Sequence, residues 1–100
     1  MAGRIVEIAQ FRLKEGMDEE RFLSISNGFQ EKYLEKQEGY IDRELLRSGG
    51  VWVDLIHWES LEAAQAVADE IMEHPESKDY IDTMDPESVS LRFFQQVQVF

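Results

Sequence analysis

The feature that most constrains the fold is a pair of glycines, Gly49-Gly50, between two segments of alternating side chains. Glycine adopts the positive φ angles of a two-residue hairpin turn, and we expect such angles at both positions. Segments 40–48 and 51–58 are therefore predicted to pair as antiparallel strands, in a register that the short loop fixes. The predicted pairs are Ser48 with Val51, Arg47 with Trp52, Leu45 with Asp54, Arg43 with Ile56, and Asp42 with His57.

Alternation along 51–58 gives this strand two different faces. One is almost entirely aliphatic and is expected to pack on helices. The other combines two indoles with a carboxylate and is expected to line a pocket or a subunit contact. The first face carries Val51, Val53, Leu55 and His57. The second carries Trp52, Asp54, Ile56 and Trp58.

A strand and a helix precede the hairpin. The apolar alternation of 4–13 predicts a strand, in which Glu7 falls in an otherwise apolar alternating set. Asp18 is the predicted N-cap of a helix that runs to about Lys36. Gly28, inside that helix, costs about 1 kcal/mol of helix stability, which predicts a bend in the helix or, as the favoured alternative, close packing against a strand.

A helix and a strand follow the hairpin. Ser60 is the predicted N-cap of a helix that stops at His74-Pro75. The acidic connection 76–87, in which we expect one helical turn at 79–83, could cover a cavity. Alternation then predicts a long last strand over 89–100.

The resulting order, β-α-β-β-α-β, is that of the α+β ferredoxin-like plait, a four-stranded antiparallel sheet with two helices on one face. We expect the uncovered face to carry the indoles and to be buried against the same face of a second copy, in a homodimer. The length of the last strand predicts that its far end crosses to the partner. The residues expected on the open face are Trp52, Ile56, Trp58 and one of Phe93 and Phe94.

Composition limits the partners of this single domain, 1–100. A chain of 100 residues with 43% hydrophobic content can bury one modest core. Its 21 acidic and 10 basic residues give a net charge of −11, which repels nucleic acid and anionic lipid. We find no secretory leader and no apolar run near the ~20 residues that span a bilayer. We therefore expect a soluble cytoplasmic protein without membrane or nucleic-acid partners.

The chain resembles the antibiotic biosynthesis monooxygenase-like family of the dimeric α/β-barrel superfamily. The resemblance spans essentially the whole domain and includes the element order. Its motifs are Lys14-Glu15-Gly16 before an acidic helix start, Gly39-Tyr40 opening the second strand, and His57-Trp58-Glu59-Ser60 before the second helix. It implies a homodimer with one small-molecule cavity in each subunit. Activities known in the family include haem degradation and the cofactor-independent oxidation of phenolic polycyclic substrates to quinones.

Residue by residue, the resemblance is partial. The quinone-forming type has Asn, Trp and Tyr at positions that hold Asp54, Trp58 and Ala64 here, and its Arg after the second helix has no identifiable counterpart. The Trp matches, and the Asp is a near match with a different charge. Haem degradation is disfavoured, because that type has an Asn, a Trp and a His at positions that hold other residues here. Those residues are Ala9, Val67 and Ser77.

Asp54 and Trp58 are the candidate catalytic residues. A carboxylate among indoles would be desolvated and could remove a phenolic proton. The alternative for Asp54 is an ion pair with Arg43 or Arg47, which the hairpin register places on the same face. Trp58 would hold an aromatic ring, and plain core or dimer packing is its alternative. The candidate substrate-binding residues are Trp52, Ile56, Arg43 and Tyr80, the last in place of the missing Tyr.

The two histidines do not predict a metal site. His57 is expected to form a buried hydrogen bond with Asp42, its cross-strand partner. His74, at a helix C-terminus, is expected to interact with the helix dipole. No closely spaced ligand pair such as H-x-x-x-H is present, so we expect no bound metal.

Two function hypotheses remain open at this stage. The first is a homodimer that binds a small aromatic or quinone-like molecule and oxidises it without a cofactor. The second is a dimer of the same fold that binds a ligand, or has a structural role, without catalysis. The contents of the cavity would discriminate between them.

Overall fold

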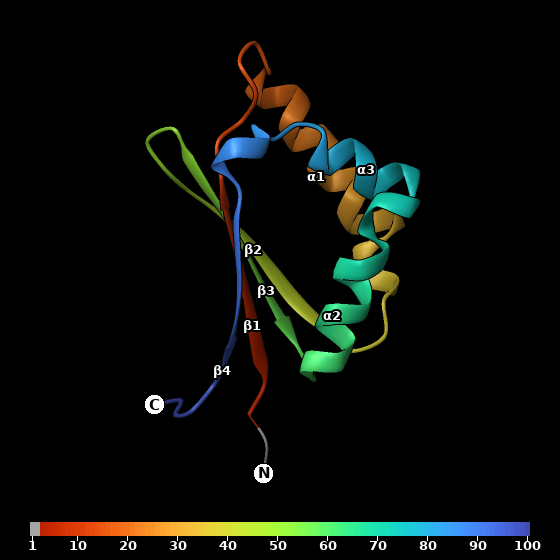
Figure 1. Ribbon diagram of the computed structural model, residues 1–100, viewed down its shortest axis with the longest axis vertical. Helices are drawn as coiled ribbons and strands as arrows, with labels where there is room; N and C mark the ends of the chain where they lie inside the picture. The colour runs from red at the N-terminus through yellow and green to blue at the C-terminus, as the bar shows by residue number, and fades with distance from the viewer. Residues whose placement is uncertain (1–2) are drawn as a thin grey trace.

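The computed structural model describes residues 3–100 and has the predicted ferredoxin-like topology (Figure 1). The four strands form one antiparallel sheet in the order β2-β3-β1-β4. The three α-helices lie on one side of the sheet (Figure 1). The strands are β1 (Ile5–Phe11), β2 (Tyr40–Ser48), β3 (Val51–Trp58) and β4 (Ser90–Gln95). The α-helices are α1 (Glu19–Lys32), α2 (Leu61–Glu70) and α3 (Pro75–Ile81), and the short 3₁₀ helices are η1 (Leu34–Lys36), η2 (Ile71–Glu73) and η3 (Pro86–Ser88).

The hairpin register is confirmed at every predicted pair between β2 and β3. The turn differs in one respect, because Gly49 has a φ of 59° whereas Gly50 is not among the residues of positive φ. Our prediction for Gly50 was therefore wrong. A positive φ at the first central residue alone is the pattern of a type II′ turn, which matches the right-handed twist of the paired strands.

The prediction of which face of β3 the helices cover was wrong, although Asp54 and Ile56 on the Trp52 face do line a cavity, which was one of the two alternatives for that face. The Trp52/Asp54 face is buried under the helices, and the aliphatic face that includes Val53 and Leu55 is half-exposed on the open side. The reason is area: an aromatic side chain buries roughly 150–250 Å², so covering the indoles removes more apolar surface from water. We call this uncovered side the open sheet face. Its apolar residues are Val6, Ile8, Leu46, Val51, Val53, Leu55 and Phe94, and its polar residues include Gln10, Asp42, Glu44, His57 and Arg92.

Both predicted N-caps are confirmed. The Asp18 carboxylate accepts a hydrogen bond from the backbone N–H of Arg21 at 3.0 Å, and the Ser60 hydroxyl accepts one from Ala63 at 3.1 Å. The close packing favoured for Gly28 is absent, because a Cβ built there would have no heavy atom of residues 3–100 outside its own helix turn within 4 Å. The close approach occurs instead at Gly39, where a Cβ would lie 2.5 Å from that of Ala63 on α2.

The segment after α2 is more ordered than the sequence indicated. Pro75 ends the preceding helical segment and also lies in the first turn of α3. Backbone N–H groups in a first turn have no partner within the helix, so the missing N–H of proline removes no helical hydrogen bond. This helix packs against α1 and places Tyr80 in the core, with its ring stacked on Phe29 at 4.4 Å between centroids. The single turn predicted at 79–83 was therefore too short and began too late.

The last strand is shorter than predicted. β4 ends at Gln95, and the chain beyond it forms no strand. Val97, Val99 and Phe100 are at least 79% exposed, so the apolar alternation of this tail has no partner within the described residues 3–100. Among all the helices of residues 3–100, none is both long and apolar enough to cross a membrane.

Candidate functional site

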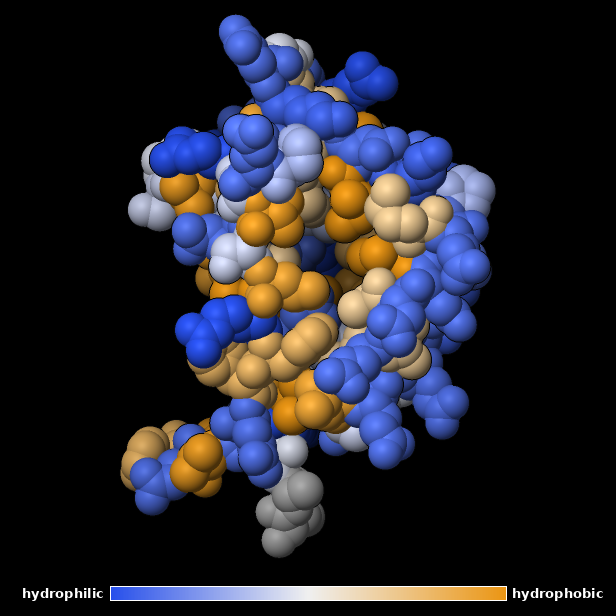
Figure 2. Space-filling model, in the orientation of Figure 1, coloured by the Kyte–Doolittle hydropathy of each residue, from blue (hydrophilic) through white to orange (hydrophobic). Residues whose placement is uncertain are grey.

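A small cavity lies between the sheet and the helices. Its volume is about 120 Å³. Figure 2 shows a hollow with mainly apolar side chains around it, on the side where β4 faces the helices. Three polar side chains, Glu7, Asp54 and Tyr80, interrupt an otherwise apolar lining, and this combination is typical of small-molecule sites. The apolar lining residues are Ala9, Phe29, Ile56, Val67, Ala68, Ile71, Ile81, Met84, Val89 and Leu91.

Asp54 is held by a buried, two-pronged ion pair with Arg43. The Arg43 Nε lies 2.8 Å from Asp54 Oδ1, and Nη2 donates to Oδ2 at 3.1 Å. The same Nη2 also donates to the Ser26 hydroxyl on α1 at 2.8 Å. Both charged side chains are less than 10% exposed. Of the two partners that the sequence allowed, Arg43 is the one observed, because Arg47 pairs with Glu19 at the surface.

Tyr80 completes this cluster from α3. Its hydroxyl donates to Asp54 Oδ2 at 2.6 Å and accepts a hydrogen bond from Arg43 Nη2 at 3.1 Å. Burial and the negative charge of Asp54 raise the pKa of Tyr80 well above its ordinary value, and Arg43 only partly opposes them. The tyrosine therefore stays a neutral hydrogen-bond donor at the edge of the cavity.

Burial disfavours the charged form of Arg43 and so lowers its pKa. The hydrogen bonds to Asp54 and the negative charge of Asp54 have the opposite effect and outweigh burial. The pKa of the guanidinium is raised above its usual value as a result. Its Cζ also lies 5.3 Å from the Phe29 ring centroid and 5.2 Å from that of Tyr80. Arg43 is therefore a fixed charge that connects β2, β3, α1 and α3.

Glu7 is the polar residue of the cavity that sequence reasoning missed. Its Oε1 accepts a hydrogen bond from the indole Nε1 of Trp58 at 3.0 Å. Burial raises the pKa of Glu7 to about 7; the Trp58 hydrogen bond opposes this rise, and the charge of Asp54 adds to it. The available signal was its place in an apolar alternating set, which indicated a carboxylate on the core-facing side of β1.

The predicted site residues divide into two groups. Asp54, Ile56 and Tyr80 line the cavity directly. Arg43, Trp52 and Trp58 lie outside it: Arg43 is behind Asp54, and Trp58 is fully buried behind Glu7. Trp52 packs edge-on against Phe22 near the hairpin turn, with ring centroids 4.9 Å apart. The catalytic and binding roles of these residues stay predictions.

The predicted pairing of His57 with Asp42 is confirmed, but the prediction that this hydrogen bond is buried was wrong. His57 Nδ1 lies 2.6 Å from Asp42 Oδ1. The pair is on the open sheet face, where the Asp42 side chain is 60% exposed. Within residues 3–100, no group of three or more histidine, aspartate and glutamate side chains is placed to hold a metal ion.

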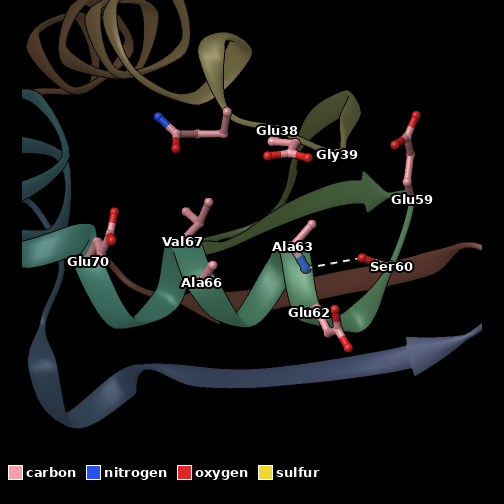
Figure 3. A pocket seen from close by; sticks show the side chains of 10 residues that line it. Glu38, Gly39, Glu59, Ser60, Glu62, Ala63, Ala66, Val67 and Glu70 are labelled. Carbon is pink, nitrogen blue, oxygen red and sulfur yellow. Dashed lines mark hydrogen bonds between the residues drawn. The ribbon is translucent and has the colours of Figure 1, made fainter.

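A second hollow lies along α2, at the surface (Figure 3). It is larger, about 410 Å³, but it is open and its rim carries four glutamates. In Figure 3 these side chains point away from one another rather than toward a common centre. They are Glu38, Glu59, Glu62 and Glu70. We therefore take the smaller apolar cavity as the candidate site.

No family model matches this sequence, and no curated protein sequence matches it either. Several solved structures are similar to the structure of this chain. SnoaB, a cofactor-independent oxygenase from Streptomyces nogalater, is similar with a TM-score of 0.78 and 15% identity, over 98% of this chain and 97% of that one. A candidate antibiotic biosynthesis monooxygenase from Bordetella bronchiseptica gives a TM-score of 0.71 and 18% identity, over 96% and 99%. This chain has the antibiotic biosynthesis monooxygenase-like fold.

The same fold occurs in a protein of different activity. The heme-degrading protein Rv3592 from Mycobacterium tuberculosis is similar with a TM-score of 0.65 and 24% identity, over 100% of this chain and 98% of that one. Identities this low establish a shared fold and leave the activity open. The sequence argument against haem degradation stays a prediction.

The buried ion pair predicts a non-additive response to mutation. Asp54→Ala should lower the free energy of unfolding by about 3–5 kcal/mol, because it leaves the Arg43 charge buried without a partner. Adding Arg43→Met should recover much of this loss, since removing both charges is often nearly neutral. Urea unfolding of the two single variants and the double variant measures the coupling, and strictly additive losses would contradict it.

The raised pKa of Glu7 predicts a pH-dependent stability. Folded Glu7 keeps a proton that the unfolded chain, with a pKa near 4.5, releases. Its contribution to stability is therefore complete below about pH 4.5 and is lost as the pH rises to about 7. Over that pH interval, the free energy of unfolding of the wild type should fall by up to about 3 kcal/mol relative to that of Glu7→Gln. Urea unfolding at several pH values tests this, with Glu31→Gln on the exposed side of α1 as a control that should follow the wild type.

Proposed function

We propose that the protein binds a small aromatic molecule in the cavity between its sheet and helices and oxidises it with molecular oxygen. The observation that carries this proposal is a mostly apolar cavity with three convergent polar groups, Glu7, Asp54 and Tyr80. A pocket of this kind holds a ring by its walls and orients its polar substituents. The likeness of the fold to SnoaB, a cofactor-independent oxygenase, supports the reaction class.

The size of the cavity favours a single-ring substrate. About 120 Å³ is less than the ~150 Å³ apolar cavity that binds benzene, and far below the ~300–1,000 Å³ of common ligand pockets. The rim is open at Val89 and Leu91, which are more than 40% exposed, so a substituent can extend outward. We therefore expect a phenol or hydroquinone rather than a polycyclic substrate.

The proposed chemistry is oxidation of a phenol to a quinone. One atom of O₂ becomes the new quinone oxygen and the other leaves as water, so O₂ accepts the four electrons that the ring loses. Asp54, fixed by Arg43, would orient the substrate hydroxyl together with Tyr80. Trp58 would act through Glu7 rather than by stacking on the ring, because it is fully buried.

Oxygen consumption tests this function. The wild type should consume O₂ with single-ring phenols or hydroquinones, and Tyr80→Phe should lower kcat/KM at least about ten-fold, because one positioning hydrogen bond is lost. Tyr33→Phe is the matched control, since the Tyr33 hydroxyl is buried outside the cavity and has no hydrogen-bond partner within residues 3–100. Consumption no faster than in buffer, across phenols of one to three rings, would contradict an oxygenase.

The second candidate is a ligand-binding protein without catalysis. The ion pair of Asp54 favours it, because a carboxylate held by Arg43 and Tyr80 is less available as a base. Binding of a phenol without oxygen consumption would support this candidate. It would also separate the binding role of the cavity from the chemistry.

We further propose that two copies pair through the open sheet face. Seven apolar side chains, six of them aliphatic, lie on this face among polar ones, and no helix of residues 3–100 covers it (Figure 1). The exposed apolar tail, Val97 to Phe100, lies beyond β4 and would add to the contact. Pairing would bury apolar surface that a single 100-residue domain leaves in water. Residence in the cytoplasm stays a prediction from the sequence.

Two leucine variants test the dimer. Leu46→Glu, on the open sheet face, should shift the protein to a monomer at micromolar concentration, because it places a charge in the contact. Leu23→Glu is matched, since Leu23 on α1 is similarly exposed, 40% against 43% for Leu46, but lies on the helical side. Sedimentation measures the mass. A wild-type monomer at that concentration would contradict the proposal.

A further inference from the structure

The carboxyl group of Glu7 is positioned like a reactive group rather than a structural one. Its register partners are Ile56 on β3 and Phe93 on β4, so it projects from the centre of the sheet toward the cavity. The hydrogen bond from Trp58 Nε1 is the only one that the Glu7 carboxyl makes within residues 3–100. One oxygen is therefore fixed, and the other is available to a ligand.

Within residues 3–100, no cationic side chain forms an ion pair with Glu7. The cavity residues supplied by α2 and η2 are apolar, as is Leu91 from β4. The titratable groups that line the cavity beside Glu7 are Asp54 on β3 and Tyr80 on α3, which are hydrogen-bonded to each other. Arg43, the nearby positive charge, is committed to Asp54. Glu7 is thus a carboxyl whose hydrogen-bonding partner on the cavity side has to come from a ligand or from water.

Trp58 gives Glu7 a defined orientation. The indole is fully buried, and its Nε1–H is a donor that cannot accept a proton. It can therefore hold one Glu7 oxygen without exchanging a proton with it. A fixed carboxyl beside apolar walls is the arrangement that a general base requires.

We propose that Glu7 is the proton acceptor for the hydroxyl group of a single-ring phenol bound in this cavity. In this step the phenol O–H bond breaks, the proton passes to the Glu7 oxygen that Trp58 does not hold, and the electron pair stays on the ligand oxygen. The inference deepens the proposed function and rests on it, because it requires that the cavity binds a ring. It assigns the base to Glu7 and leaves Asp54 as a positioning residue.

Paired binding measurements with phenol and toluene test the assignment. The two rings are similar in size, but only phenol has a hydroxyl, and it stays neutral over the range used. In the wild type, the affinity for phenol should rise about five-fold from about pH 5.5 to about pH 8.5, because a hydrogen bond to a carboxylate is stronger than one to a neutral acid. The affinity for toluene should show no such rise. Ligand-observed NMR titration gives both values.

Two variants make the test specific. Glu7→Gln keeps an acceptor for Trp58 but cannot ionise, so its affinity for phenol should be independent of pH. Glu31→Gln, on the exposed side of α1, should keep the wild-type rise. If the affinity of Glu7→Gln for phenol rises with pH as in the wild type, or if phenol and toluene bind equally at the higher pH, the role of Glu7 is overturned while the proposed function of the cavity stands. Binding of neither ring would overturn the proposed function as well.

Discussion

The buried ion pair between Asp54 and Arg43 is the interaction on which the architecture of the site depends. Burying two charges is costly unless each is fully hydrogen-bonded, and this pair meets that condition with contributions from several elements. Arg43 comes from β2, Asp54 from β3, Ser26 from α1 and Tyr80 from α3. Displacing α1 or α3 would remove a hydrogen bond from the buried pair, and separating β2 from β3 would break the pair itself. The pair therefore specifies how α1 and α3 dock on the sheet.

The same interaction gives the two carboxyl groups of the cavity different properties. Asp54 has a cationic partner and a hydroxyl donor, whereas the one hydrogen-bond donor to the Glu7 carboxyl within residues 3–100 is a neutral indole. Burial without a counter-charge raises the pKa of Glu7 to about 7, and the negative charge of Asp54 adds to the effect. A carboxyl with this pKa exchanges its proton near neutral pH, which is what acid–base chemistry requires. The two carboxyl groups of the cavity therefore differ in their partners: Asp54 is paired with a cation, and Glu7 has no cationic partner within residues 3–100.

Much of the fold could be predicted from local patterns. The Gly49-Gly50 turn defined the hairpin, its length fixed the register, and the caps at Asp18 and Ser60 marked two helix starts. The errors arose where tertiary packing decides. Alternation separates the two faces of a strand but does not say which one the helices cover, and the Trp52 face was covered because its burial removes more apolar area.

The candidate site shows the same division. Sequence alone determined that Arg43 would lie diagonal to Asp54 and that Glu7 would share a face with apolar residues, because strand periodicity and turn length fix both relations. Only the tertiary structure decided that α3 carries Tyr80 to Asp54 and that the Trp58 indole reaches across to Glu7. Those contacts join segments far apart in the chain, and no local pattern encodes their distances. The chemistry proposed for the cavity depends on them.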